Sequence, residues 1–144
     1  MSPRHHVLAQ GEGTSYEWEC DHVLVKTPCG MTEGRTTVVE DTLKPGFHLA
    51  RHHHKAMAEV FVVLDGEVTF TFDDESIIAS PGMTVNVPPM VWHEAETANG
   101  AKMLTVFSPG GFDNYLAEIV ALEDKASDAA VMKELNERYD IWFA

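Results

Sequence analysis

Short apolar and β-branched runs alternate with turn residues from Tyr16 to Ser108. Two of these runs, Val23–Val25 and Thr36–Val39, are bounded by glycine and proline. Many short runs separated in this way are typical of a β-sandwich or barrel. The dipeptides Asp65-Gly66 and Asn99-Gly100 are hairpin signals, so we expect a tight hairpin at each. The stretch is therefore predicted to be all-β.

A helical pattern replaces the strand pattern after this stretch. Residues 114–122 carry apolar side chains at helical spacing, and Asp113 is expected to cap that helix. Ser127 is expected to cap a second helix, in which Leu135 and Tyr139 share an apolar face. About 35 residues are too few for a separate domain. We therefore predict one domain, with an N-terminal arm over residues 1–15, a β-barrel over residues 16–108 and a helical extension packed outside the barrel over residues 109–144.

Charge and apolar content exclude several classes of function. The chain has 10 Lys and Arg against 23 Asp and Glu, so its net charge of −13 repels polyphosphates and we expect no nucleic-acid partner. No apolar run approaches the roughly 20 residues that span a bilayer, so we expect no membrane contact. Because the N-terminus lacks the apolar stretch of a secretory signal, we expect a cytoplasmic protein. Cys20 and Cys29 make no disulfide framework at this size, and we expect both to be reduced.

Four of the eight histidines lie between His48 and His54. Side chains alternate along a strand, so His52 and His54 share one face while His53 points the other way and is expected to be solvated. Imidazoles two residues apart are roughly 6.6 Å apart along the strand and can converge on one ion. His48 lies roughly 13 Å from His52, too far for the same ion, and is expected to be structural or at the pocket rim; the alternative is that it hydrogen-bonds to a ligand residue.

Two further residues complete a candidate metal site. Glu59 precedes the apolar run Val60–Leu64, where a carboxylate is costly unless it binds a cation or is paired. His93 stands beside Trp92 in an otherwise apolar segment. Three imidazoles and one carboxylate suit a divalent transition metal such as iron, nickel, manganese, cobalt or zinc. The predicted ligands are His52, His54, Glu59 and His93; the alternative is that they are hydrogen-bonded core residues without a metal.

The same residues resemble the two sequence motifs of the cupin superfamily. The first motif is Gly, five residues, His-x-His, three or four residues, Glu, six residues and Gly. It is met by Gly46, His52, His54, Glu59 and Gly66. The second motif is Gly, five residues, Pro-x-Gly, two residues, His, three residues and Asn. Gly82, Pro88 and His93 match it, whereas Met90 and Thr97 replace its later Gly and its Asn.

The resemblance implies a double-stranded β-helix, a jelly-roll barrel, with the metal inside one end. It also implies a homodimer that exchanges or pairs edge strands. The segment Gly110-Gly111-Phe112 resembles the loop before the helical tail of small cupins related to quercetinase, a flavonol dioxygenase. The implied function is that of a metal-dependent dioxygenase that uses O2 on a small phenolic or enolisable compound. In this interpretation Glu59 is both a metal ligand and the general base.

Two other functions fit the same residues. One is a metal-dependent lyase, isomerase or cyclase that needs no oxygen, and the other is a module that binds a small molecule without catalysis. Inward-facing side chains near the metal end of a small barrel line its pocket. The pocket candidates are Phe70, Phe72, Trp92, Met103 and Phe107. The alternative is that these side chains belong to an ordinary packed core.

Overall fold

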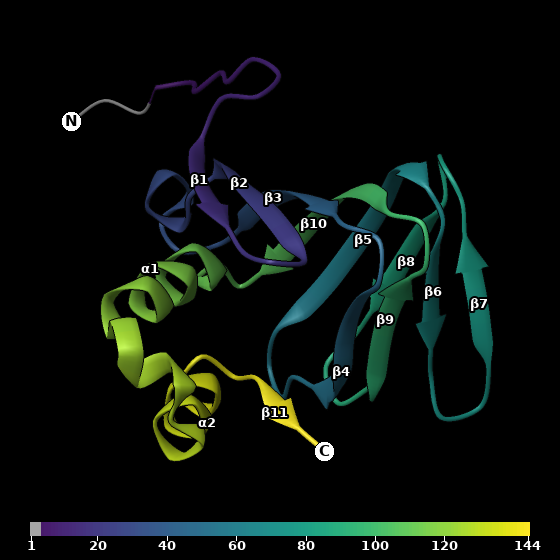
Figure 1. Cartoon of the computed structure of the whole chain (residues 1–144). Helices are drawn as coiled ribbons and strands as arrows, with labels where there is room; N and C mark the ends of the chain where they lie inside the picture. The colour runs from purple at the N-terminus through teal and green to yellow at the C-terminus, as the bar shows by residue number, and fades with distance from the viewer. Residues whose placement is uncertain (1–3) are drawn as a thin grey trace.

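Two antiparallel β-sheets face each other in the computed structural model, which describes residues 4–144 (Figure 1). The first sheet contains, in spatial order, β1 (Thr14–Glu17), β2 (Asp21–Thr27), β3 (Thr37–Leu43), β10 (Ala101–Ser108), β5 (Ala58–Gly66) and β8 (Thr84–Val87). The second contains β11 (Trp142–Phe143), β4 (Phe47–His53), β9 (His93–Thr97), β6 (Val68–Thr71) and β7 (Ser76–Ala79). From β3 to β10 the chain passes repeatedly between the sheets, so the predicted jelly-roll barrel is confirmed.

The predicted hairpins at Asp65-Gly66 and Asn99-Gly100 are wrong. Asp65-Gly66 ends β5 and Asn99-Gly100 lies between β9 and β10, and in both cases the next strand joins the opposite sheet. The two turns lie against each other, because a Cβ on Gly66 would come within 2.5 Å of the Gly100 carbonyl oxygen. Gly66 also has a φ of 72°, which disfavours other residues. Local turn chemistry therefore located the chain reversals without indicating which sheet receives the following strand.

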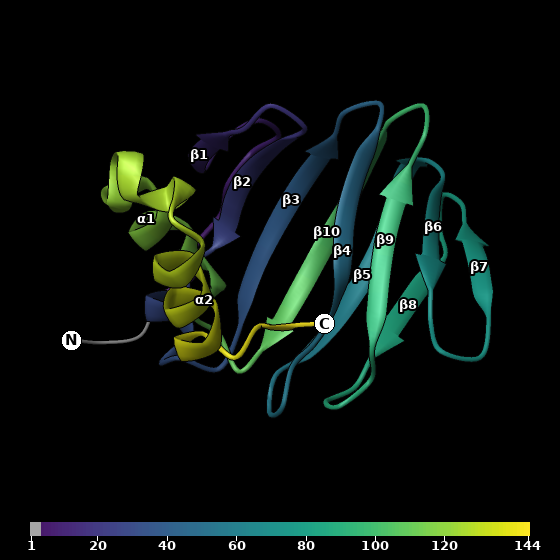
Figure 2. The ribbon, with the colours of Figure 1, turned by 60° about the horizontal axis from the view of Figure 1, so that its bottom comes forward.

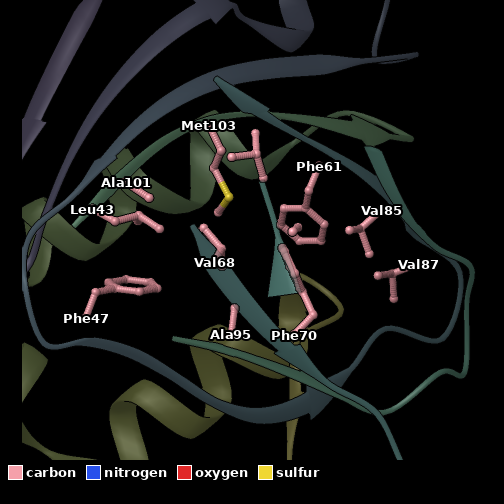
Figure 3. Close-up of a cluster of buried hydrophobic side chains, with 12 residues drawn as sticks. Leu43, Phe47, Phe61, Val68, Phe70, Val85, Val87, Ala95, Ala101 and Met103 are labelled. Carbon is pink, nitrogen blue, oxygen red and sulfur yellow. The ribbon is translucent and has the colours of Figure 1, made fainter. Parts of the chain in front are cut away.

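The space between the two sheets is filled by apolar side chains (Figure 3). Phe70 in β6 is fully buried, and its ring centroid lies 5.0 Å from that of Phe61 in the opposite sheet. The core residues that Figure 3 labels on the first sheet are Leu43, Phe61, Val85, Val87, Ala101 and Met103. Those on the second sheet are Phe47, Val68, Phe70 and Ala95. Their alternation with exposed residues agrees with the predicted strand phase.

Two helices, α1 (Phe112–Leu122) and α2 (Ala129–Arg138), lie beside the sheets (Figures 1 and 2). Together with Ile141 they form a second apolar cluster with β2, β3 and β10. Short 3₁₀ turns occur at Cys29–Thr32 and Glu123–Ser127. None of the helices in residues 4–144 is long and apolar enough to cross a bilayer.

Several predicted boundaries differ from the structure. Asp113 does not cap α1, because its carboxylate accepts hydrogen bonds from Thr37 Oγ1 (2.7 Å) and from the Cys29 backbone N–H (3.2 Å). The cap of α2 is Asp128, which accepts from two backbone N–H groups, and not Ser127. Strand β1 begins inside the predicted arm 1–15, of which residues 1–3 lie outside the described residues. The final strand, β11, was not predicted.

Candidate metal centre

The fold brings the four predicted ligand residues together. They come from three strands that are distant in sequence: β4 with the residue that follows it, β5 and β9. One ligand atom from each lies within 4.8 Å of all the others. The four residues are almost fully buried, with exposed fractions of 3% for His52, 3% for His54, 5% for Glu59 and 0% for His93.

Hydrogen bonds fix the orientation of the three imidazoles. In each ring Nδ1 donates to a backbone carbonyl, and a carbonyl can only accept, so Nδ1 carries the proton. The acceptors are Ala50 for His52 (2.7 Å), Asp140 for His54 (2.7 Å) and Val91 for His93 (2.9 Å). In their neutral form the rings therefore present unprotonated Nε2 atoms toward one another, and this is the form of histidine that binds a metal.

The buried polar atoms of this cluster fit a divalent cation. Within the described chain, His54 Nε2, His93 Nε2 and Glu59 Oε2 have no hydrogen-bond partner. The Glu59 carboxylate approaches His54 Nε2 at 3.1 Å and His93 Nε2 at 3.2 Å without hydrogen-bond alignment. Two ligand atoms of one ion lie about 3 to 4 Å apart, so the cluster needs only a small contraction to hold one.

The protonation states also suit metal binding. Burial, and then the neighbouring His93, lower the pKa of His52 to about 4, so this ring is neutral at pH 7. Burial alone would raise the pKa of Glu59, but the close approach and charge of His54 and His93 outweigh it and lower the pKa to about 2. Glu59 is therefore an anion at neutral pH, and its proximity raises the pKa of His54 against the effect of burial.

Strand alternation separates His53 from the cluster as predicted, but the prediction that His53 is solvated is wrong. Only 8% of it is exposed, because its ring packs on Trp92 at 4.1 Å between centroids and because it pairs with Trp142 in β11. His48 is exposed, and its Nε2 lies 3.0 Å from Glu94 Oε2. Neither residue belongs to the four-residue cluster.

A cavity of about 160 Å³ opens beside the cluster. Of the predicted pocket residues, Met103 and Phe107 line it. The others do not contribute to its lining in the described chain: Phe70 and Phe72 belong to the core between the sheets, and Trp92 packs on His53. The apolar part of the wall includes Phe47, Phe61, Phe112, Tyr115, Ile141 and Phe143.

The C-terminal tail supports the centre in a way that sequence reasoning missed. The Asp140 carbonyl accepts from His54 Nδ1, and its carboxylate accepts from the backbone N–H groups of Lys55, Ala56 and Met57 at 2.7 to 2.9 Å. Strand β11 then pairs with β4 and places Phe143 with its ring centroid 5.3 Å from that of His52. A polar residue between a helix and two aromatic residues carries no recognisable motif.

Asp140→Ala keeps the carbonyl that orients His54 but removes the carboxylate that anchors that carbonyl to the segment after β4, so we expect Co²⁺ binding to weaken by about tenfold. The same change removes an acceptor from three N–H groups, so the free energy of unfolding should fall by about 3 kcal/mol. Calorimetric titration with Co²⁺ measures the first effect and chemical denaturation the second. The matched control is Asp128→Ala, which should cost about 1 kcal/mol as a lost helix cap and leave Co²⁺ affinity unchanged. Equal Co²⁺ affinity in Asp140→Ala and wild type would contradict the role of the tail.

A pair of carboxyl groups, Asp21 and Asp41, also lines the cavity and was missed at the sequence level. Burial raises the pKa of Asp21 to about 6. Burial, and then the charge of Asp21, raise the pKa of Asp41 well above its ordinary range, with Glu59 adding to the repulsion. A hydrogen bond with Asp41, and then His22 and Lys44, lower the pKa of Asp21 but do not offset burial. Single acidic residues in strands are common, and only the pairing of β2 with β3 brings these two together.

We expect the pair to make stability fall as pH rises. A carboxyl group with a raised pKa binds more protons in the folded than in the unfolded chain, so its contribution is lost as pH increases from about 4 toward the folded pKa. For Asp21 this window ends at about pH 6, and Asp41 extends it. In metal-free protein, Asp41→Asn should therefore melt a few degrees above wild type at pH 8 and close to it at pH 4. A variant that melts below wild type at pH 8 would show that the pair is stabilising.

Residues 39–107 match the family model described as "Cupin domain". No curated protein matches the sequence. Among solved structures, KdgF from a Halomonas species has a TM-score of 0.67 at 17% identity, covering 76% of this chain and 98% of that one. An RmlC-like cupin from Shewanella frigidimarina has a TM-score of 0.65 at 19% identity, with coverage of 78% and 98%. A predicted oxalate decarboxylase from Thermotoga maritima has a TM-score of 0.66 at 16% identity, with coverage of 72% and 99%.

Proposed function

The chain belongs to the cupin superfamily, and from its four-residue centre we propose that it is a metal-dependent dioxygenase acting on a small phenolic or enolisable compound. The observation that carries the proposal is the position of three of the four ligand residues, His52, His54 and Glu59, in the wall of a largely apolar cavity. The ligands would be His52, His54, Glu59 and His93, and iron, nickel, manganese, cobalt and zinc all suit them.

The size of the cavity limits the substrate. An engineered protein cavity of about 150 Å³ accommodates benzene, so the 160 Å³ beside the centre accommodates about one ring. The three-ring flavonols of quercetinase chemistry exceed this volume. Aromatic and aliphatic side chains, among them Phe47, Phe61 and Phe107, form the wall, so a flat apolar ring is the matching shape. The proposed substrate is therefore a single-ring phenol or a small enol.

Glu59 has the position of a general base. When bound, a divalent ion would supply a Lewis acid that favours the ionised form of a substrate hydroxyl. The Glu59 carboxylate is anionic at neutral pH and lies 3.1 Å from His54 Nε2. A substrate hydroxyl bound at this cluster would lie within reach of the carboxylate, which can accept its proton. The apolar wall excludes water and keeps that proton from exchanging with solvent.

A second function is favoured by the carboxyl pair in the same cavity. Asp21 and Asp41 supply a proton donor and acceptor in addition to Glu59. A lyase, isomerase or cyclase needs two such groups, one to remove a proton and one to return it elsewhere. Consumption of O2 separates this reaction from the dioxygenase.

The test is O2 uptake by protein loaded in turn with Fe²⁺, Ni²⁺, Mn²⁺ and Co²⁺, with a panel of catechols and single-ring enols. The proposal predicts uptake that depends on both substrate and metal and is lost in His52→Ala. The matched control, His48→Ala, removes an exposed histidine outside the cluster and should leave uptake unchanged. Substrate turnover without uptake would favour the non-oxidative reaction. Neither turnover nor uptake with any metal would contradict both.

We also propose a homodimer. Strand β7 is a free edge of the second sheet, and Ile78 on it is 61% exposed. An unpaired edge that carries an exposed apolar residue is a surface that a second copy can cover. Light scattering that gives twice the chain mass supports the pairing, whereas a single-chain mass at micromolar concentration contradicts it.

A further inference from the structure

Asp21 and Asp41 lie on the inner face of the first sheet, on neighbouring strands. In the register of β2 and β3, Asp41 is opposite Val23 and Asp21 is opposite Leu43, so the two carboxyl groups are diagonal neighbours on one face. Both line the cavity that His52 also lines, although neither belongs to the four-residue cluster. Along β10, Asp41 pairs with Met103 and Glu59 with Phe107, four residues farther on, so the carboxyl pair and the metal centre occupy separate places in the cavity wall.

The carboxyl pair has unused hydrogen-bonding capacity. Asp41 is only 8% exposed, the buried Asp21 Oδ1 has no N–H or hydroxyl donor in residues 4–144, and the two carboxyl groups hydrogen-bond to each other. Buried carboxylate oxygens without a donor are costly, and such groups in a cavity wall are typical of a ligand site. Because burial raises the pKa of both groups, the pair retains a proton near neutral pH and can both donate and accept.

The charge of the cavity selects the ligand further. Among the described residues that line it there is no Lys or Arg, while Asp21, Asp41 and Glu59 are all acidic. Lys44 lies near Asp21, but it contacts Glu17 and the Trp18 carbonyl instead of the cavity. An anionic group would therefore be repelled at this end, whereas a hydroxyl or an ammonium group would be attracted.

We propose that Asp21 and Asp41 bind a hydrogen-bond donor, either a hydroxyl or an ammonium group, at the end of the substrate away from the metal centre. The inference rests on the proposed function only in using the same cavity and centre. It specifies the substrate as a neutral or cationic single-ring compound that carries metal-binding oxygens at one end and a donor at the other. Substrates with a carboxylate at the distal end are excluded.

The test is anaerobic calorimetric titration of the Zn²⁺-loaded protein with four related probes. Catechol has no distal group, benzene-1,2,4-triol adds a hydroxyl, dopamine adds an ammonium, and 3,4-dihydroxybenzoate adds a carboxylate. We expect the better of the two donor probes to bind about tenfold to hundredfold more tightly than catechol, as for a hydrogen bond to a charged group. The benzoate should bind more weakly than catechol. The comparison of triol with dopamine identifies the donor.

Variants test whether the tighter binding of the donor probes depends on the carboxyl pair. Asp41→Asn and Asp21→Asn should each remove most of the donor advantage while leaving catechol affinity within about threefold of wild type. The matched control is Asp65→Asn, the same chemical change at an exposed residue of β5, which should preserve the advantage. Thermal melts of each variant confirm folding, and the wild-type probe series tests the inference without any substitution.

The outcomes separate this inference from the proposed function. If catechol binds but neither donor probe binds more tightly than catechol, the inference is overturned and the metal-dependent function stands. If donor probes bind equally with and without Zn²⁺ and lose affinity in Asp41→Asn, the carboxyl site stands and the metal-dependent function is contradicted. If none of the probes binds, both are overturned. A benzoate that binds more tightly than catechol would also overturn the inference.

Discussion

Replacing His93 by Ala is expected to weaken Co²⁺ binding by well over 100-fold. This histidine is fully buried at the start of β9, and its Nδ1 is held by the Val91 carbonyl so that Nε2 faces Glu59. Loss of a group that merely orients a ligand costs about tenfold to hundredfold in metal affinity, and loss of the ligand itself costs more. Calorimetric titration with Co²⁺ measures the effect, and the same result is expected for His52→Ala.

His53→Ala is the matched control for this prediction. His53 lies between two members of the cluster and is also buried, but it packs on Trp92 on the other face of β4. The variant should lose stability through the lost packing and keep Co²⁺ affinity within about threefold of wild type. Equal losses of Co²⁺ affinity in the His52, His53 and His93 variants would contradict the separation of the two faces.

Replacing Glu59 by Gln is expected to lower turnover by about 100-fold to 10,000-fold at saturating metal, the usual contribution of a general base. Gln is nearly isosteric and keeps one oxygen ligand, but its amide cannot accept the substrate proton and carries no charge. Affinity for the metal should fall as well, because the anion is replaced by a neutral group. Steady-state kinetics at several metal concentrations separates the two effects.

The ionisation state of the substrate provides the control for Glu59. A substrate whose hydroxyl is already ionised at the assay pH needs no base, so Glu59→Gln should slow it much less than a substrate with a protonated hydroxyl. Equal losses with both substrates would indicate that Glu59 acts only as a metal ligand. Full activity of the variant at saturating metal would contradict any role in proton transfer.

The spacing of the metal-ligand residues could be read from the sequence because it follows from local geometry. His52 and His54 share a face in any extended strand, and an isolated Glu59 before an apolar run is costly without a cation. His93 was identified from its apolar setting and from resemblance to a family motif, and not from local geometry, since nothing local joins β4 to β9. The structure places all of them in one cluster.

Features that depend on long-range pairing could not be read in this way. The hairpin signals at residues 65–66 and 99–100 describe the turn but not the sheet that the next strand enters. The contact between Asp140 and the segment after β4 joins residues more than 80 positions apart. The pairing of Asp21 with Asp41 depends likewise on the register of β2 and β3. Asp140 orients the ligand residue His54, and Asp21 and Asp41 add acidic groups to the cavity wall, so both contacts matter for the chemistry of the site.

One divalent transition metal is expected to bind at the four-residue centre, and elemental analysis measures this binding without any substrate. The protein is reconstituted with excess Co²⁺, Mn²⁺, Fe²⁺, Ni²⁺ or Zn²⁺ in turn, desalted and measured for metal per chain. The account predicts about one ion per chain for at least one metal and almost none for His93→Ala treated identically. No retained metal in wild type, or equal metal in wild type and His93→Ala, would contradict it.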